Sequence, residues 1–213
     1  MSTDGSLENS AGHLALRQAA IRLGFKPRCT KFLFLRHGRT AGNIGRIYQH
    51  PDIPLAAEGF ADADLAAEAL RNVAFERIYA SDMARAWLTA GRVASTTGRP
   101  VYLTRALRER YFGDFIGTSS VGLDWRIDPP NGETMMGFIE RTLRGIEEIL
   151  EPTSHALLVS HGGVLRVLCG AMDYELPVEL TANALPLAFE CHAGKWTVTP
   201  LMEPAVIQQL GAA

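Results

Sequence analysis

The chain has 213 residues, a formal net charge of −2 and an apolar fraction of 47%, which are the values of an ordinary globular protein with one well-filled core. The balanced charge argues against a nucleic-acid-binding protein, which needs a basic excess, and no apolar run approaches the roughly 20 residues that span a bilayer. The start of the chain lacks the features of a secretory signal, and its three widely spaced cysteines suit a reducing compartment. We therefore expect a cytoplasmic monomer or homodimer that binds neither nucleic acid nor membrane.

Residues 1–30 differ in composition from the rest and are predicted to be an N-terminal extension that is partly disordered or helical. Residues 1–11 are polar and rich in Gly and Ser, a composition typical of disorder. A short helix is predicted to follow, and its apolar face would consist of Leu14, Ala15, Ile21 and Leu23.

The main body alternates short apolar runs with longer helical patterns, which predicts an α/β fold with a mostly parallel sheet and helices on both faces. The predicted strands are Phe32–Leu35, Arg77–Ala80, Val101–Leu103 and Ala156–Val159. The predicted helices are Glu58–Asn72, Met83–Thr97, Glu133–Glu151 and Val164–Cys169. Leu187–Cys191 and Trp196–Val198 flank His192–Lys195, which predicts a terminal antiparallel hairpin. Residues 31–213 contain no repeat and no linker, so we expect them to form a single domain.

Polar residues follow three of these strands, each at the point where the strand ends. The first strand runs into Arg36-His37-Gly38, the second into Ser81-Asp82 with Arg85 one turn later, and the fourth into Ser160-His161-Gly162-Gly163. Because ligands bind beyond the carboxyl ends of parallel strands, we expect these side chains to lie at one rim. Arginine forks, imidazoles, helix starts and glycines that permit close approach together predict a phosphate site.

The same residues belong to five short segments that follow one another in a fixed order. The segments are Arg36-His37-Gly38-Arg39-Thr40 with Asn43, Ser81-Asp82 with Arg85-Ala86, Leu107-Arg108-Glu109 with Gly113 and Gly117, Pro130 and Gly132-Glu133 with Arg141, and Ser160-His161-Gly162-Gly163. Together they resemble the histidine phosphatase superfamily, also called the phosphoglycerate-mutase-like family. The resemblance runs from Phe32 to about Val198 and implies that family's fold, with residues 31–213 as the catalytic domain.

The resemblance also implies a role for each polar residue of the rim. His37 would attack phosphorus and form a phosphohistidine. Arg36, Arg85 and His161 would surround the phosphoryl oxygens, so that neither a metal nor a cofactor is needed. Glu109 would protonate the leaving oxygen and then take the proton from the attacking water. Further contacts with the substrate would come from Asn43, Gln49 and Gly162.

The implied activity is hydrolysis of a small phosphorylated metabolite by a metal-independent phosphomonoesterase. Mutases of this family carry a long insertion rich in Lys and Arg after the glutamate segment, whereas the stretch from Gly117 to Pro130 is short and holds one cation, Arg126. An open pocket admits water, which favours hydrolysis over return of the phosphate. Specificity would come from an apolar lid around residues 113–136. Its apolar side chains would be Phe115, Trp125, Ile127 and Met135.

Several alternatives stay open at this point. The protein could instead be a phosphoglycerate mutase, or a non-catalytic phosphate-binding protein on the same fold. A metallohydrolase is a third alternative, with a metal held by His37, Asp82, Glu109 and His161. Ser81-Asp82 is predicted to cap a helix, and His50 has the best claim among the other histidines to line the pocket mouth. Arg39 stands where the family usually has Glu or Gln, so it would favour a polyanionic substrate or pair with a nearby carboxylate.

Overall fold

The computed structural model describes residues 5–150, 152 and 155–210, and within this part of the chain six strands form one sheet. The strands are β1 (Lys31–Arg36), β2 (Arg77–Ser81), β3 (Val101–Thr104), β4 (Ala156–Ser160), β5 (Pro186–His192) and β6 (Lys195–Pro200). Their order in the sheet is β3-β2-β4-β1-β5-β6, and the first four in that order are parallel. β5 runs antiparallel to β1 and forms a hairpin with β6. The predicted fold class, including the terminal hairpin, is confirmed.

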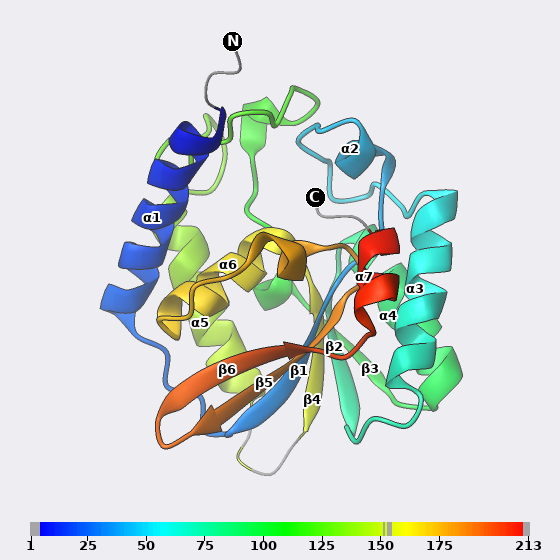
Figure 1. The fold of residues 1–213 in the computed structure, drawn as a ribbon. Helices are drawn as coiled ribbons and strands as arrows, with labels where there is room; N and C mark the ends of the chain where they lie inside the picture. The colour runs from blue at the N-terminus through cyan, green and yellow to red at the C-terminus, as the bar shows by residue number, and fades with distance from the viewer. Residues whose placement is uncertain (1–4, 151, 153–154, 211–213) are drawn as a thin grey trace.

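Helices cover both faces of this sheet. The α-helices are α1 (Gly5–Leu23), α2 (Ala41–Ile44), α3 (Ala57–Leu70), α4 (Ala84–Thr97), α5 (Met135–Ile149), α6 (Gly162–Ala171) and α7 (Pro204–Leu210). Short 3₁₀ turns lie at η1 (Arg105–Leu107), η2 (Gly113–Phe115) and η3 (Val178–Thr181). Figure 1 shows α1, α5 and α6 on one side of the sheet, with α3, α4 and α7 on the other. No helix in the described ranges is long and apolar enough to cross a membrane.

Two boundaries differ from the predicted ones in ways that matter for function. α6 begins at Gly162 and not at Val164, so its first turn follows His161 directly. The hairpin turn is tighter than predicted, because β5 reaches His192 and β6 begins at Lys195. The two residues between them, Ala193 and Gly194, both have positive φ angles, of 51° and 81°. Such a pair matches the twist of the flanking strands.

The N-terminal segment differs most from its prediction. Residues 5–11 belong to α1, so the disorder expected for them is wrong, whereas residues 1–4 lie outside the described residues. The predicted apolar face is wrong as well, because Leu14, Ile21 and Leu23 are largely exposed. The side of α1 that is buried consists of Gly12, Leu16, Ala19 and Ala20. These mostly small residues let the helix lie close to its neighbours. The positions of its larger apolar side chains did not predict this buried side.

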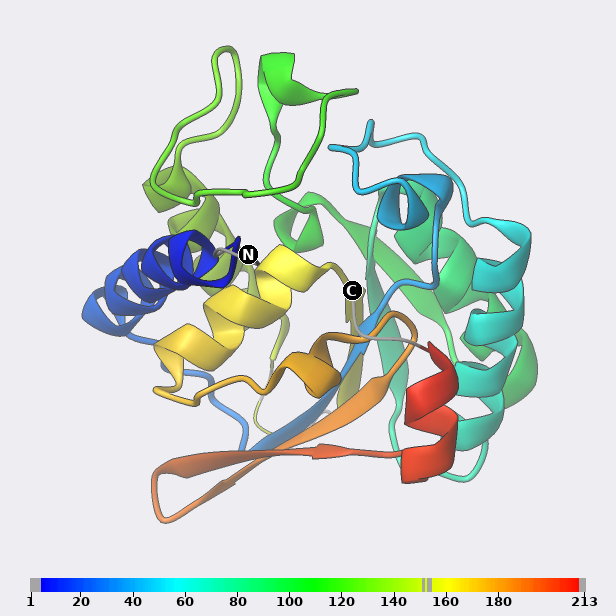
Figure 2. The ribbon, with the colours of Figure 1, turned by 45° about the horizontal axis from the view of Figure 1, so that its top comes forward.

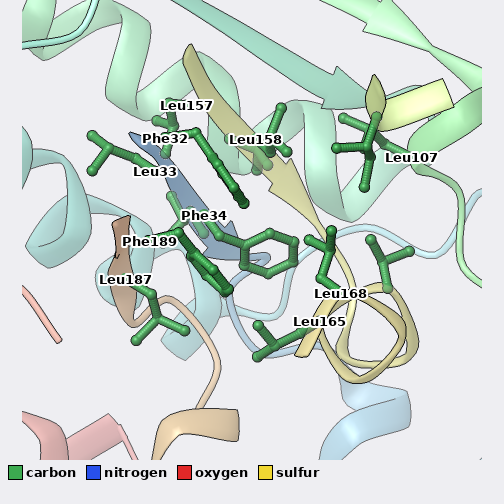
Figure 3. Close-up of a cluster of buried hydrophobic side chains, with 14 of the residues drawn as sticks. Phe32, Leu33, Phe34, Leu107, Leu157, Leu158, Leu165, Leu168, Leu187 and Phe189 are labelled. Atoms are coloured by element: carbon green, nitrogen blue, oxygen red, sulfur yellow. The ribbon is translucent and has the colours of Figure 1, made fainter. Parts of the chain in front are cut away.

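The core is a continuous cluster of buried apolar side chains from the sheet and from the helices on it, α1 included. Figure 3 shows its centre, where Phe34 and Phe189 lie between the strands and Leu165 of α6. Phe32 stacks on Phe189 with ring centroids 4.8 Å apart. Each fully buried side chain of this size stabilises the fold by about 1.5–3 kcal/mol. This packing holds β1 and β4 side by side, and both strands end at the site described next.

Candidate active site

The two histidines of the predicted rim come together because β1 and β4 are neighbours in the centre of the sheet. Arg36 is opposite Ser160 in the register of the two strands, and the backbone N–H of His37 donates to the Ser160 carbonyl at 3.0 Å. The rings of His37 and His161 therefore lie with centroids 5.1 Å apart. Figure 2 shows the segments around residues 40–55 and 110–130 rising beyond this end of the sheet. They form the surroundings of the site.

Two hydrogen bonds determine the protonation state of His37. Its Nδ1 lies 2.8 Å from the Gly38 carbonyl, which can only accept, so Nδ1 carries the proton. Its Nε2 lies 3.2 Å from Nε of Arg85, which can only donate, so Nε2 carries the lone pair. Burial, followed by the charges of Arg85 and Arg36, holds the pKa of His37 well below 6.5. The neutral ring thus presents a nucleophilic nitrogen toward two cations.

Gly38 is required by a close backbone approach beside this histidine. A Cβ atom at Gly38 would lie 2.2 Å from the carbonyl oxygen of Gly59, in the first turn of α3. A Cβ at Gly59 would in turn lie 1.9 Å from the carbonyl oxygen of Arg39. Both distances are impossible for a side chain, so only glycine at these positions lets α3 pack against the chain that carries His37.

Arg36 and Arg85 reach the site from different elements and are both buried. Arg36 ends β1, and its NH1 donates to the Thr181 carbonyl. Arg85 lies in the first turn of α4, where its NH1 donates to the carbonyl of His50 at 3.3 Å. Burial lowers the pKa of each guanidinium to about 10, which leaves both charged at neutral pH. The side chain of His50 points elsewhere and lies 3.5 Å from Asp52.

His161 is oriented by Ser81, a residue that the sequence placed at the same rim but predicted to cap a helix. Its Nε2 lies 2.9 Å from the hydroxyl of Ser81 at the end of β2, and both residues are fully buried. The predicted helix cap at Ser81-Asp82 is wrong, because Met83 occupies the cap position of α4. Asp82 instead forms a two-pronged ion pair with Arg108, at 2.5 and 2.7 Å. Burial, and then the neighbouring Arg85, hold the pKa of His161 well below 6.5.

Two nitrogen atoms of this cluster are buried and lack a partner among the described residues. They are Nε of Arg36 and Nδ1 of His161. Gly162 lies beside this arginine and lines the cavity with it. A buried polar atom without a partner costs about 1–3 kcal/mol, so an oxygen-rich anion that supplies acceptors would be bound favourably.

Asn43 and Gln49 lie together on the opposite wall and share a contact with Thr40. The Thr40 hydroxyl is 2.8 Å from Oδ1 of Asn43 and 2.7 Å from Oε1 of Gln49. The Thr40 backbone N–H also donates to Oδ1 of Asn43, which completes a capping box at the start of α2. Asn43 and Gln49 both line the cavity.

Glu109 lies in the cavity wall next to the start of α6. Its carboxylate accepts from the backbone N–H of Gly163 at 2.9 Å and from its own neighbour Arg110 at 3.0 Å. Gly163 must be glycine, because a Cβ there would lie 2.1 Å from Oε1 of Glu109. Arg36, Arg85 and Arg166 all interact electrostatically with this carboxylate. Among the described residues it is the one acidic side chain in the lining of the cavity, which includes Arg36 but not His37, Arg85 or His161.

The backbone that leads to Glu109 is held by Arg141 of α5. Its NH1 donates to the carbonyls of Arg105, Ala106 and Arg108 at 2.9–3.2 Å. The same guanidinium pairs with Glu133 at 2.8 and 2.9 Å. Two residues of the Pro130–Arg141 segment thus position Glu109 from a distance.

The predicted apolar lid differs in composition from the segment that is present. Trp125 lines the cavity, but it is 2% exposed and stacks on Phe138 in the core at 5.8 Å. The buried guanidinium of Arg110 donates a hydrogen bond to the Trp125 carbonyl at 3.0 Å. Phe115, Ile127 and Met135 do not line the cavity. Besides Trp125, the residues of this stretch that line it are Ser120 and Leu123.

Two further residues of the site were missed. Asn183, 2% exposed, donates from Nδ2 to the His37 carbonyl at 2.8 Å. Arg166 of α6 lines the cavity, and its NH1 donates to the carbonyl of Gly162 at 3.2 Å. Its position four residues after Gly162 places it on the same helix face, so helical spacing could have found it. No such local signal marks Asn183.

Arg39 points away from the cavity and pairs with Asp62 of α3, which decides between its two predicted roles. Its Nε and NH2 donate to the two carboxylate oxygens of Asp62, both at 2.7 Å. The Asp62 side chain is only 4% exposed. Arg39 therefore ties the chain after His37 to α3 and does not contact a substrate in this cavity.

Replacing Asp62 with asparagine is expected to lower the free energy of unfolding by about 2–3 kcal/mol, because Arg39 would lose a buried partner. Asp64→Asn is the matched control, since Asp64 lies on the same helix and pairs with Arg92 through side chains that are 57% and 46% exposed. The control should change the free energy by less than about 0.5 kcal/mol. Urea denaturation measures both, and equal losses would contradict the contribution assigned to Asp62.

Stability is expected to fall as the pH drops below 6.5. Burial is the main cause of the lowered pKa of His37, His161 and His13, the last to about 4. The unfolded chain would protonate these rings near 6.5, whereas the folded chain keeps them neutral. The stabilisation is therefore complete above 6.5 and is lost below it, by about 1.4 kcal/mol per pH unit for each ring.

Urea denaturation between pH 6.5 and 5 measures this slope. His13→Gln should reduce the slope by the equivalent of about one proton, because one of the three rings is gone. A variant with the slope of the parent would contradict the lowered pKa of His13.

Comparison with known proteins places the chain in a family. A model of the histidine phosphatase superfamily (branch 1) matches residues 32–199. The protein belongs to the histidine phosphatase superfamily, as predicted. The adenosylcobalamin/alpha-ribazole phosphatase of Salmonella typhimurium is 29% identical over 187 residues, which cover 79% of this chain and 89% of the relative. The glucosyl-3-phosphoglycerate phosphatase of Mycobacterium tuberculosis is 31% identical over 175 residues, which cover 71% of this chain and 78% of that relative. The solved structure of the alpha-ribazole phosphatase from Shigella flexneri matches with a TM-score of 0.69 at 28% identity, and covers 81% of this chain and 96% of that one.

Proposed function

We propose that the protein is a metal-independent phosphomonoesterase that hydrolyses a small phosphorylated metabolite through a phosphohistidine on His37. The observation that carries the proposal is the pair of hydrogen bonds that leave Nε2 of His37 with its lone pair, beside unpartnered nitrogen atoms of Arg36 and His161. A neutral nucleophile surrounded by buried cations and donors is complementary to a phosphoryl group that gains charge on its oxygens. The two relatives described above are named as phosphatases, and a relative named as a phosphoglycerate mutase matches at a lower identity of 26%.

The reaction proceeds in two displacements at phosphorus. Nε2 of His37 forms the P–N bond as the P–O bond to the alcohol breaks, and Glu109 donates its proton to the leaving oxygen. Water then attacks phosphorus, Glu109 takes back a proton, and the P–N bond breaks to release phosphate and neutral His37. Arg36, Arg85 and His161 stabilise the phosphoryl oxygens in both steps. Nδ1 of His37 keeps its proton throughout and donates it in a hydrogen bond to the Gly38 carbonyl.

Hydrolysis is favoured over mutase activity by the composition of the wall opposite His37. The segment from residue 117 to residue 130 has one cation, Arg126, and its guanidinium pairs with Asp124 at 2.6 Å. No lysine lines the cavity. Because Arg126 is paired with Asp124, this segment supplies no further cation to retain a released product, so that water can replace it, although Arg36, Arg46, Arg110 and Arg166 line other parts of the cavity.

The metallohydrolase alternative is disfavoured by the partners of the candidate ligands. Asp82 is occupied by Arg108, and Nε2 of His37 faces Arg85. Glu109 accepts from backbone N–H groups at the start of α6. A cation placed among these groups would meet guanidiniums on two sides.

A panel of phosphomonoesters, assayed with and without a strong chelator and alongside a mutase assay with 3-phosphoglycerate, tests the proposal. We expect release of inorganic phosphate that the chelator leaves unchanged, and no formation of 2-phosphoglycerate. Loss of activity on chelation would instead favour a metallohydrolase. Transfer of phosphate without net hydrolysis would favour a phosphoglycerate mutase. Absence of turnover for every ester would favour a non-catalytic binding protein.

We also propose a cytoplasmic location, and action as a monomer or homodimer without nucleic acid. The support is the net charge of −2 and the three cysteines, Cys29, Cys169 and Cys191, which are all free thiols.

A further inference from the structure

α1 lies outside the part of the chain that matches the family, yet it forms part of the wall of the catalytic cavity. The family match begins at residue 32, whereas His13 of α1 lines the cavity together with Arg36 and Glu109. Figure 2 shows α1 beside α6, and the two helices are in extensive contact. α1 is therefore placed to contact whatever is attached to the phosphate.

Two glycines fix α1 in this position. A Cβ at Gly12 would lie 2.9 Å from the backbone nitrogen of Trp125, so α1 packs directly on the segment that forms another part of the cavity wall. A Cβ at Gly170 of α6 would lie 3.1 Å from Cα of Arg17. The helix is thus fitted to both neighbours by close backbone contact.

A second cavity, of about 320 Å³, lies between α1 and α6 and adjoins the catalytic cavity of about 250 Å³. Both cavities are lined by His13 and Arg166, so these two side chains form their common wall. Apolar side chains at the rim of the second cavity are left open to solvent, since Leu14 and Val178 are 51% and 64% exposed next to Leu176, and the polar side chains of Arg17, Tyr174 and Glu175 also belong to the lining. Large apolar side chains left open to solvent around a hollow are typical of a binding surface.

The common wall suits a ligand that passes from one cavity to the other. Arg166 forms no salt bridge with any carboxylate of the described residues, and its NH1 donates to a backbone carbonyl. His13 stays neutral at physiological pH, because burial and the neighbouring Arg166 lower its pKa to about 4. Neither side chain forms a salt bridge among the described residues, although Arg166 interacts electrostatically with Glu109, and both offer polar groups to a ligand.

We propose that α1 and α6 form a subsite for the leaving group, in which His13 and Arg166 contact the alcohol portion of the substrate and the adjoining cavity receives its elongated, apolar end. This inference rests on the proposed function. The substrate class is then a phosphomonoester whose alcohol is long and predominantly apolar.

The position of Glu109 gives the direction in which the leaving group departs. Glu109 protonates the leaving oxygen and is bound to Gly163, whereas Arg166 is bound to Gly162 in the same turn of α6. The leaving oxygen is therefore released close to Arg166. The catalytic cavity is smaller than the roughly 300 Å³ at which pockets for drug-sized ligands begin, so a large alcohol must extend beyond it.

Binding of n-alkyl phosphonates from ethyl to decyl, measured by titration calorimetry on the full-length protein, tests the subsite. These compounds keep the anionic head but cannot be hydrolysed, so the result does not depend on turnover. The parent is expected to bind decyl phosphonate at least about tenfold more tightly than ethyl phosphonate. Val178→Trp should remove most of this gain, because the indole would occupy the cavity mouth. Val121→Trp is the matched control, since Val121 is 59% exposed and lines neither cavity.

A second pair of variants tests the same rim from α1. Leu14→Asp should also abolish the gain with chain length, whereas Ile21→Asp, on the same helix but outside both cavities, should retain it. Affinity that does not depend on chain length, or a gain that both rim variants retain, would overturn the subsite. Failure of the proposed function is distinguishable, because it would appear as absent phosphate release while the phosphonate series still bound.

Discussion

Replacing His37 with alanine is expected to lower kcat for every phosphomonoester by about 10³-fold or more. The variant lacks the atom that forms the bond to phosphorus, and the remaining cations can bind the ester but cannot accept the phosphoryl group. Steady-state release of phosphate measures the effect. KM should change far less than kcat, because Arg36, Arg85 and His161 stay in place.

His192→Ala is the control for this variant, since His192 lies on the exposed β5–β6 hairpin and is 76% exposed. It should retain the activity of the parent. A rapid acid-free quench of the parent with radiolabelled substrate should trap protein-bound phosphate that is stable to alkali and labile to acid. The proposed role of His37 would be contradicted if the variant trapped as much phosphate as the parent, or if it turned over substrate at the parent rate.

Replacing Glu109 with glutamine is expected to lower kcat by about 10²–10³-fold for esters of simple alcohols. Glutamine keeps the size of the side chain, and its carbonyl can still accept from Gly163, but it has no proton to give. A p-nitrophenyl ester should lose far less in the first step, because its phenolate leaves without protonation. The measurement is the ratio of kcat/KM for an alkyl ester and the p-nitrophenyl ester, in the variant and in the parent.

This dependence on the leaving group separates acid catalysis from a structural role. If Glu109 only held the start of α6 in place, both esters would be affected equally, and such a result would contradict the proposal. Glu140→Gln on the exposed side of α5 serves as the control and should leave the ratio unchanged.

The long-range contacts of Ser81 and Asn183 explain why some features of the site could not be predicted. Each acts on a histidine far away in the chain, Ser81 on His161 and Asn183 on His37. Such a contact depends on the order of strands in the sheet. Serine and asparagine are also common in turns, so the residue types by themselves indicate nothing about it.

The N-terminal helix shows the same limit for packing. Its bulkier apolar residues suggested one face, but the buried face is the one with Gly12, Ala19 and Ala20. Which side of a weakly amphipathic helix is buried depends on the surface it meets, and that surface is made by α6 and by the chain around Trp125.

The sequence by itself determined the parallel α/β core, the location of Arg36, His37 and His161 at strand ends, and that of Arg85 one turn after a third strand. Those features follow from local patterns, since continuous apolar runs predict buried strands and the residue after a parallel strand lies at the ligand-binding edge. Only the tertiary structure decided the proton position on His37, the pairing of Arg39 with Asp62, and the part of α1 in the cavity wall. Each of these depends on atoms brought together from distant parts of the chain, and no spacing along the sequence encodes them.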